Sequence, residues 1–180
     1  MKLILVRHGE TDENAAKVSQ GHLNTPLTEK GRKQAKEVAE KLKDEKIDLC
    51  YCSDLDRCLD TTKEIVKFHP HLKIVLAKEL REQAKGKSEG QPHEKVYAKF
   101  DQTNVPYHLW DYDGGETLVE VFDRVVSFVD SLKKKHSGQT VLLVSHGGPI
   151  STLLIKMNND PITENRKYRF NNTEFKMVGY

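Results

Sequence analysis

Two short apolar runs constrain the fold of this chain more than any other feature of its sequence. Residues 3–6 read Leu-Ile-Leu-Val and residues 141–144 read Val-Leu-Leu-Val, with no polar residue inside either run. A strand with one wet face alternates apolar and polar residues, whereas a strand covered by helices on both faces of a parallel sheet is continuously apolar. We therefore expect both runs to be strands inside a mostly parallel sheet.

Helical patterns alternate with these runs. Apolar residues recur at helical spacing from about 35 to 42, after Thr28 as a capping residue, and again at 55–66 and 118–132. A shorter helix is expected after Gly148, and further strands are expected near 49–52, 73–76 and 175–178. This alternation predicts an α/β fold: a three-layer α/β/α sandwich with a mostly parallel central sheet and helices on both faces. With 180 residues, we expect one domain over residues 1–180.

The segment from about 79 to 115 breaks the alternation. It is rich in glycine and proline, and a short helix at about 93–101 is the only regular element expected in it. A long excursion of this kind is typical of a lid over a site rather than of a passive link. We expect a lid-like insertion here.

Composition narrows the classes of partner. The formal net charge of +2 is too small to predict a nucleic-acid-binding surface, and no run approaches the roughly 18 apolar residues of a membrane span. The chain begins with a strand pattern rather than with the charged and apolar regions of a signal peptide. Cys50, Cys52 and Cys58 lack the spacing of a zinc site and are expected to be reduced and mostly buried. We expect a cytoplasmic protein without a nucleic-acid or membrane partner.

Both apolar runs end in the same way, with one polar residue followed by His-Gly. The first run continues as Arg7-His8-Gly9 and the second as Ser145-His146-Gly147. A single histidine after a strand is more often a hydrogen-bonded structural residue, but the pattern occurs here twice. Ligands of open α/β sheets bind beyond the carboxyl ends of the strands. If the two strands are parallel neighbours, His8 and His146 converge in one pocket.

Cations and backbone amides are expected around these histidines. Arg7 lies beside His8, and Arg57 lies where the strand near 49–52 gives way to a helix. An alternative for Arg57 is an exposed helix arginine paired with Asp56 or Asp60. The amides that follow Gly147 belong to a helix start, which binds anions. Two arginines, two imidazoles and a helix N-terminus suit a compact dianion such as a phosphoryl group.

The sequence resembles the histidine phosphatase superfamily, which includes cofactor-dependent phosphoglycerate mutase. Six blocks appear in the family's order and cover nearly the whole chain: RHGET (7–11), PLTEKGRKQA (26–35), SDLDRCLDT (53–61), LRE (80–82), GGET (114–117) and SHGG (145–148). The resemblance implies that His8 is the nucleophile and becomes a phosphohistidine. It also implies the residues that hold the phosphoryl group, namely Arg7, Asn14, Arg57, His146 and Gly147.

The resemblance further implies that Glu82 is the proton donor to the leaving oxygen. Glu89 and Glu116 lie in or next to the same excursion and stay open as alternatives, and Glu82 itself has the alternative of a surface carboxylate near Arg81. No metal ion or cofactor is required by this chemistry. The partner that the resemblance implies is a small-molecule phosphate ester.

The choice between phosphatase and mutase depends on the excursion. Mutases of the family hold a phosphoglycerate carboxylate with arginines after the acidic residue, and no arginine occurs between Glu82 and Gly115. We therefore expect hydrolysis of small phosphate monoesters, with a mutase as the alternative and a non-catalytic phospho-ligand binder less favoured. Lys85 and Lys87 are either solvated loop lysines or attract a second anionic group. Residues 171–180 are expected to complete the sheet or to form a homodimer contact.

Overall fold

In the computed structural model, which describes residues 1–180, the two apolar runs are neighbouring parallel strands. β1 (Lys2–Arg7) pairs with β4 (Thr140–Ser145), so that the last residues of the two strands, Arg7 and Ser145, are register partners. The five-stranded sheet has the order β3-β2-β4-β1-β5. β2 (Leu49–Cys52) and β3 (Ile74–Leu76) continue the parallel arrangement, and β5 (Phe175–Gly179) is antiparallel to β1 at the edge. The mostly parallel sheet is confirmed.

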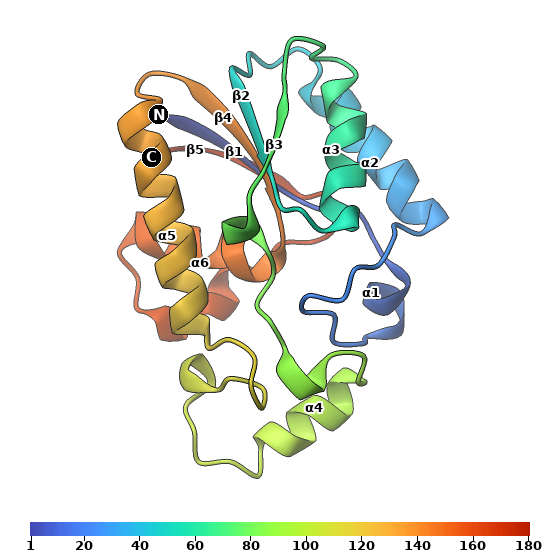
Figure 1. Cartoon of the computed structure of the whole chain (residues 1–180), viewed down its shortest axis with the longest axis vertical. Helices are drawn as coiled ribbons and strands as arrows, with labels where there is room; N and C mark the ends of the chain where they lie inside the picture. Colours follow the sequence, from blue (N-terminus) through green and yellow to red (C-terminus); the bar gives the residue numbers. More distant parts are fainter.

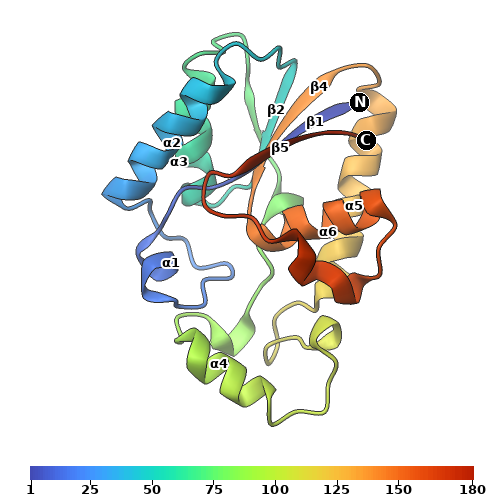
Figure 2. The ribbon, with the colours of Figure 1, turned by 180° about the vertical axis from the view of Figure 1, so that it is seen from behind.

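Helices cover both faces of the sheet, which makes the three layers visible in Figures 1 and 2. α2 (Glu29–Leu42) and α3 (Asp56–Val66) cover one face, and α5 (Leu118–Lys135) and α6 (Gly147–Asn158) cover the other. Successive side chains of a strand point to opposite faces. Accordingly, Leu3 and Leu5 belong to the core beneath α5 and α6, whereas Ile4 and Val6 belong to the core beneath α2 and α3. Two buried faces explain the unbroken apolar run.

Local signals set the helix boundaries. The Thr28 side chain accepts a hydrogen bond from the backbone amide of Gly31 (2.9 Å) and caps α2, as expected. Thr117 and Glu120 form a reciprocal capping box at the start of α5. α1 (Asp12–Ala16), a single helical turn capped by Thr11, was not expected from the sequence.

The insertion between β3 and α5 contains α4 (His93–Phe100) and three short 3₁₀ helices, η1 (Lys78–Leu80), η2 (Gly86–Ser88) and η3 (Tyr107–Leu109). It has a small apolar cluster of its own, made by Val96, Trp110 and Tyr112. A second segment, η4 (Ile162–Tyr168), follows α6 and contacts both α6 and η3. The insertion and η4 therefore meet over the same end of the sheet, where β1 and β4 terminate (Figure 2).

Three further expectations concern the cysteines and the tail. Cys50, Cys52 and Cys58 are free and buried, as expected, and burial raises the pKa of the Cys58 thiol to about 12. Residues 175–179 complete the sheet as β5, while the homodimer contact stays a prediction.

None of the helices combines the length and the apolar character needed to cross a membrane.

Candidate active site

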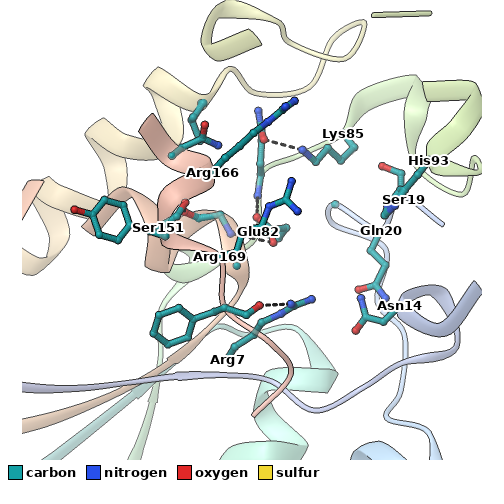
Figure 3. A pocket seen from close by; sticks show the side chains of 18 of the residues that line it. Arg7, Asn14, Ser19, Gln20, Glu82, Lys85, His93, Ser151, Arg166 and Arg169 are labelled. Atoms are coloured by element: carbon teal, nitrogen blue, oxygen red, sulfur yellow. Dashed lines mark hydrogen bonds between the residues drawn. The ribbon is translucent and has the colours of Figure 1, made fainter. Parts of the chain in front are cut away.

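A cavity of about 590 Å³ lies at the carboxyl end of β1, between the insertion, the start of α6 and the segment around η4 (Figure 3). Five of the residues expected in the site line it: Arg7, His8, Asn14, Glu82 and Gly147. Two others, Arg57 and His146, lie next to His8 but do not line the cavity. Nowhere in the structure do three or more His, Cys, Asp or Glu side chains gather in a way that would hold a metal ion.

The hydrogen bonding of His8 fixes which ring nitrogen is available. Nδ1 lies 2.7 Å from the carbonyl oxygen of Gly9, and a carbonyl only accepts, so Nδ1 carries the proton. Nε2 then holds the lone pair and has no protein partner. Only two buried side-chain atoms lack a hydrogen-bond partner, Arg7 Nε and Thr25 Oγ1. His8 Nε2 also lacks a partner but is not one of these buried atoms, so it is accessible from the cavity that His8 lines. Burial, followed by the charges of Arg57 and Arg7, holds the pKa of His8 well below its usual value.

His146 and Arg57 form a layer behind His8. The rings of His8 and His146 are 5.0 Å apart at 62°, so the two histidines do meet as expected. Arg57 Nε donates to His146 Nδ1 (3.2 Å), which leaves the His146 proton on Nε2, where it is donated to Ser53 Oγ at 2.9 Å. The other guanidinium nitrogens of Arg57 donate to the carbonyls of Leu23 (2.7 Å) and Gly21 (2.8 Å).

These contacts bear on two expectations for Arg57 and decide one of them. Arg57 does not pair with Asp56 or Asp60, because it is fully buried and its donors are used inside the fold. Contact of Arg57 and His146 with phosphoryl oxygens stays a prediction, since in this structure their polar atoms already have protein partners. What they provide directly is a rigid, positively charged wall behind the His8 ring.

Arg7 is the guanidinium on the cavity side of the wall. One of its terminal nitrogens donates to the Phe170 carbonyl at 2.5 Å (Figure 3), while Nε is buried and unpartnered. A buried N–H without a partner costs free energy, and an anion oxygen would satisfy it. A Cβ added at Gly147 would lie 4.0 Å from this Nε, so the unpartnered N–H lies near the start of α6.

Asn14 presents an amide to the cavity. Its Oδ1 accepts hydrogen bonds from the Thr11 amide (3.3 Å) and from Asn172 Nδ2 (3.1 Å), which fixes the orientation of the side chain. The Nδ2 donor therefore remains unused. Asn172 also donates to the His8 carbonyl (3.1 Å), so one residue of the C-terminal segment holds both Asn14 and the nucleophile loop in place.

Glu82 lies at the N-terminus of α6. Its carboxylate accepts a hydrogen bond from the Gln83 amide (2.9 Å) and a longer one from the Gly148 amide (3.4 Å). A carboxylate is favoured at the positive end of a helix. A Cβ at position 148 would lie 2.3 Å from Glu82 Oε1, so glycine is what allows this close approach.

The two alternative carboxylates are occupied elsewhere. Glu89 accepts from the backbone amide of His22 (2.8 Å), and Glu116 pairs with Arg124 (2.7 Å), which lowers the pKa of Glu116 even though burial opposes the shift. Neither lines the cavity, whereas Glu82 is the carboxylate that does. The geometry therefore favours Glu82 among the three as the acid in contact with a ligand.

Two cations of the cavity were not expected from the sequence. Arg166, in η4, and Arg169, directly after it, line the cavity together with Lys85, whereas Lys87 lies outside it (Figure 3). No arginine occurs between Glu82 and Gly115, as expected, but the C-terminal segment contributes two. Their sequence context offers no signal, because basic residues in a loop after a proline are ordinarily solvated. Gln20 and Ser151 also line the cavity and were not expected from the sequence.

The two buried histidines predict a pH dependence of stability. Burial lowers the pKa of both His8 and His146 well below the ordinary value near 6.5, so the folded protein does not take up protons that the unfolded chain binds. The free energy of unfolding is therefore complete above pH 6.5 and falls below it, by at most about 1.4 kcal/mol per pH unit for each histidine. Urea unfolding at pH 7.5 and 5.5 measures the loss. His8→Gln should show a smaller loss than the native protein; an equal loss would contradict the prediction.

Comparison with known proteins places this geometry in a family. The sequence model of the histidine phosphatase superfamily (branch 1) matches residues 3–180. Phosphoserine phosphatase 1 of Hydrogenobacter thermophilus is 35% identical over 157 residues, which are 85% of this chain and 74% of that protein. Phosphoglycerate mutase-like protein 4 of Arabidopsis thaliana is 34% identical over 160 residues, covering 84% of this chain and 69% of that protein.

Similarity to a solved structure supports the same family as these two sequence relatives. The mycobacterial glucosyl-3-phosphoglycerate phosphatase superposes with a TM-score of 0.87 and 29% identity, over 98% of this chain and 88% of that one. The similarity thus extends over nearly the whole length, including the segments that surround His8. On these grounds the chain belongs to the histidine phosphatase superfamily, branch 1.

Proposed function

We propose that residues 1–180 form one catalytic domain that hydrolyses small phosphate monoesters through a phosphohistidine on His8. The observation that carries the proposal is the hydrogen bond from His8 Nδ1 to the Gly9 carbonyl, because it leaves the Nε2 lone pair open to the cavity. The lowered pKa of His8 keeps that nitrogen unprotonated at neutral pH. A neutral imidazole with a defined free nitrogen is the form that attacks phosphorus.

In the first step, Nε2 of His8 attacks phosphorus while the ester P–O bond breaks. Arg7, with its unpartnered Nε, and the free amide of Asn14 hold the phosphoryl oxygens. Such preorganised donors are usually the largest catalytic contribution. Glu82 enters this step in its protonated form and gives that proton to the leaving oxygen, which departs as an alcohol. The ring gains positive charge as the N–P bond forms, and the Gly9 carbonyl stabilises it through the Nδ1 proton.

In the second step, water attacks the phosphohistidine. The Glu82 carboxylate left by the first step takes a proton from this water, whose oxygen bonds to phosphorus as the N–P bond breaks. The bond electrons return to Nε2, inorganic phosphate leaves, and His8 and Glu82 regain their initial forms. One acid–base residue serves both steps because the alcohol and the water occupy the same side of the phosphoryl group.

The reaction is tested by a panel of substrates. We expect phosphate release from p-nitrophenyl phosphate and from several alkyl phosphates, including phosphoserine and glycerol 3-phosphate. A parallel incubation with 3-phosphoglycerate and trace 2,3-bisphosphoglycerate detects mutase activity. Interconversion of phosphoglycerates without phosphate release would show that the activity is that of a mutase and not of a phosphatase. Absence of both activities would favour a phospho-ligand binder.

A further inference from the structure

The cavity carries more positive charge than one phosphoryl group needs. Its lining contains four cations, Arg7, Lys85, Arg166 and Arg169, and a single carboxylate, Glu82. None of the four cations forms an ion pair with a carboxylate. A phosphoryl dianion bound at Arg7 would leave most of this charge unused.

Two arginines outside the cavity, unlike those that line it, are paired with carboxylates. Arg81 makes a bidentate pair with Asp54, with both N–O distances at 2.6 Å, and Arg124 pairs with Glu116. In contrast, neither Arg166 nor Arg169 has a protein hydrogen-bond partner, and both side chains are exposed. Planar guanidinium groups without a carboxylate partner are suited to bind an anion from outside the protein.

The spare cations lie apart from the nucleophile. Arg7 ends β1 beside His8, whereas Lys85 belongs to the insertion and Arg166 to η4, and Figure 3 shows these two at the opposite end of the drawn cavity from Arg7. Arg169 lies between Arg7 and this pair of cations, near Glu82. The positive charge of the cavity therefore has two centres: the first is at His8, and the second lies between the insertion and the C-terminal segment.

Neighbouring side chains orient the second centre. Lys85 Nζ donates to Gln83 Oε1 (2.7 Å) and lies 3.7 Å from the centre of the Tyr112 ring. The guanidinium carbon of Arg166 lies 5.3 Å from the centre of the Tyr107 ring. Cation–π contacts hold a cation in place without neutralising it. Both cations are thus directed while their charge stays available.

We propose that Arg166 and Arg169, together with Lys85, bind a second anionic group of the substrate. The inference rests on the proposed function and narrows it, since the preferred substrates are then phosphate monoesters that carry a carboxylate or a second phosphate on the alcohol side. The leaving group extends from His8 past Glu82 toward the second centre. Specificity is decided by the C-terminal segment rather than by arginines of the insertion.

Matched substrates and variants test this subsite. 3-Phosphoglycerate and glycerol 3-phosphate differ in a carboxylate, and fructose 1,6-bisphosphate and fructose 6-phosphate differ in a phosphate. We expect the first member of at least one pair to have the higher kcat/KM. In the double variant Arg166→Gln/Arg169→Gln this preference should fall about 10- to 100-fold, the range expected for losing charge-assisted hydrogen bonds. Which pair responds identifies the anion.

Lys167→Gln is the control, because Lys167 belongs to the same segment, pairs with Asp160 and does not line the cavity. It should keep the native preference. The proposal is overturned if the native protein shows no preference, or if the double variant loses activity equally on both members of each pair.

Calorimetric titration of the same ligands into His8→Ala separates this subsite from the reaction. Tighter binding of the members that carry a second anionic group, lost on adding Arg166→Gln/Arg169→Gln, supports the subsite even if the native protein hydrolyses no ester. In that case the proposed function fails and the subsite stands. Equal binding of both members overturns the subsite whatever the hydrolytic activity.

Discussion

Replacing His8 by alanine is expected to reduce kcat/KM for every phosphate ester by about 10⁴-fold or more, the scale seen when a catalytic nucleophile is removed. The reason is that His8 Nε2 presents a free lone pair to the cavity, whereas the neighbouring His146 uses Nδ1 to accept from Arg57. Cys58 cannot substitute, because burial keeps its thiol protonated. Phosphate release from p-nitrophenyl phosphate and phosphoserine measures the effect.

The covalent intermediate gives an independent check. Native protein mixed with ³²P-labelled substrate and quenched in base should carry label that is stable in base and released by acid, as expected of a phosphorus–nitrogen bond. Peptide mapping should place the label at residue 8, and His8→Ala should carry none. Label on any other side chain would refute the mechanism. Circular dichroism of His8→Ala distinguishes loss of chemistry from loss of folding.

Glu82→Gln should slow the hydrolysis of alkyl phosphates by about 10²- to 10⁴-fold, the usual contribution of general acid catalysis. p-Nitrophenyl phosphate should be affected far less, because nitrophenolate leaves without a proton. Glutamine keeps an oxygen that can accept from the Gln83 amide, so the local structure is retained. Comparing kcat for leaving groups of increasing basicity measures the effect. An equal loss for all of them would remove Glu82 from this role.

Two glycine variants and one carboxylate variant serve as controls for Glu82. Gly148→Ala places a Cβ 2.3 Å from Glu82 Oε1 and should displace this flexible carboxylate, reproducing the dependence on the leaving group. Gly147→Ala meets its nearest atom, Arg7 Nε, at 4.0 Å and should keep the native dependence. Glu89→Gln removes a carboxylate that accepts from the backbone amides of residues 22 and 85. It should alter stability without changing the dependence on the leaving group.

Much of the fold was predictable because its signals are local. The run at residues 3–6 is apolar throughout because both faces of β1 are buried, and the cap at Thr28 fixes where α2 begins. α1 escaped prediction because a single turn has no apolar periodicity; its stability comes from the Thr11–Asn14 capping box. η4 escaped prediction because it is a 3₁₀ segment whose conformation is set by the elements that it contacts, α6 and η3, rather than by an apolar periodicity.

Some features of the site were likewise predictable from the sequence, and others were not. Arg7, His8 and Gly147 were predictable because they lie at strand ends and at a helix start, whereas Asn14 and Glu82 were expected from the family resemblance; all five line the cavity. The position of Arg57 next to His8 was also predictable, but its burial and its contacts with two carbonyls of the loop at residues 21–23 were not. Those contacts depend on how a distant loop packs against α3.

By itself the sequence determined the parallel sheet, the two histidines at its carboxyl edge and the family, because continuous apolar runs and ordered motifs are properties of the chain alone. Only the tertiary structure decided which polar atoms remain free. The fold points His8 Nε2 toward a cavity and places Arg57 and His146, already hydrogen-bonded, behind it. It also brings Arg166 and Arg169 of the C-terminal segment to the same cavity as Lys85 of the insertion. The physical reason is that hydrogen-bond satisfaction and long-range packing depend on neighbours in space, which the order of residues does not list.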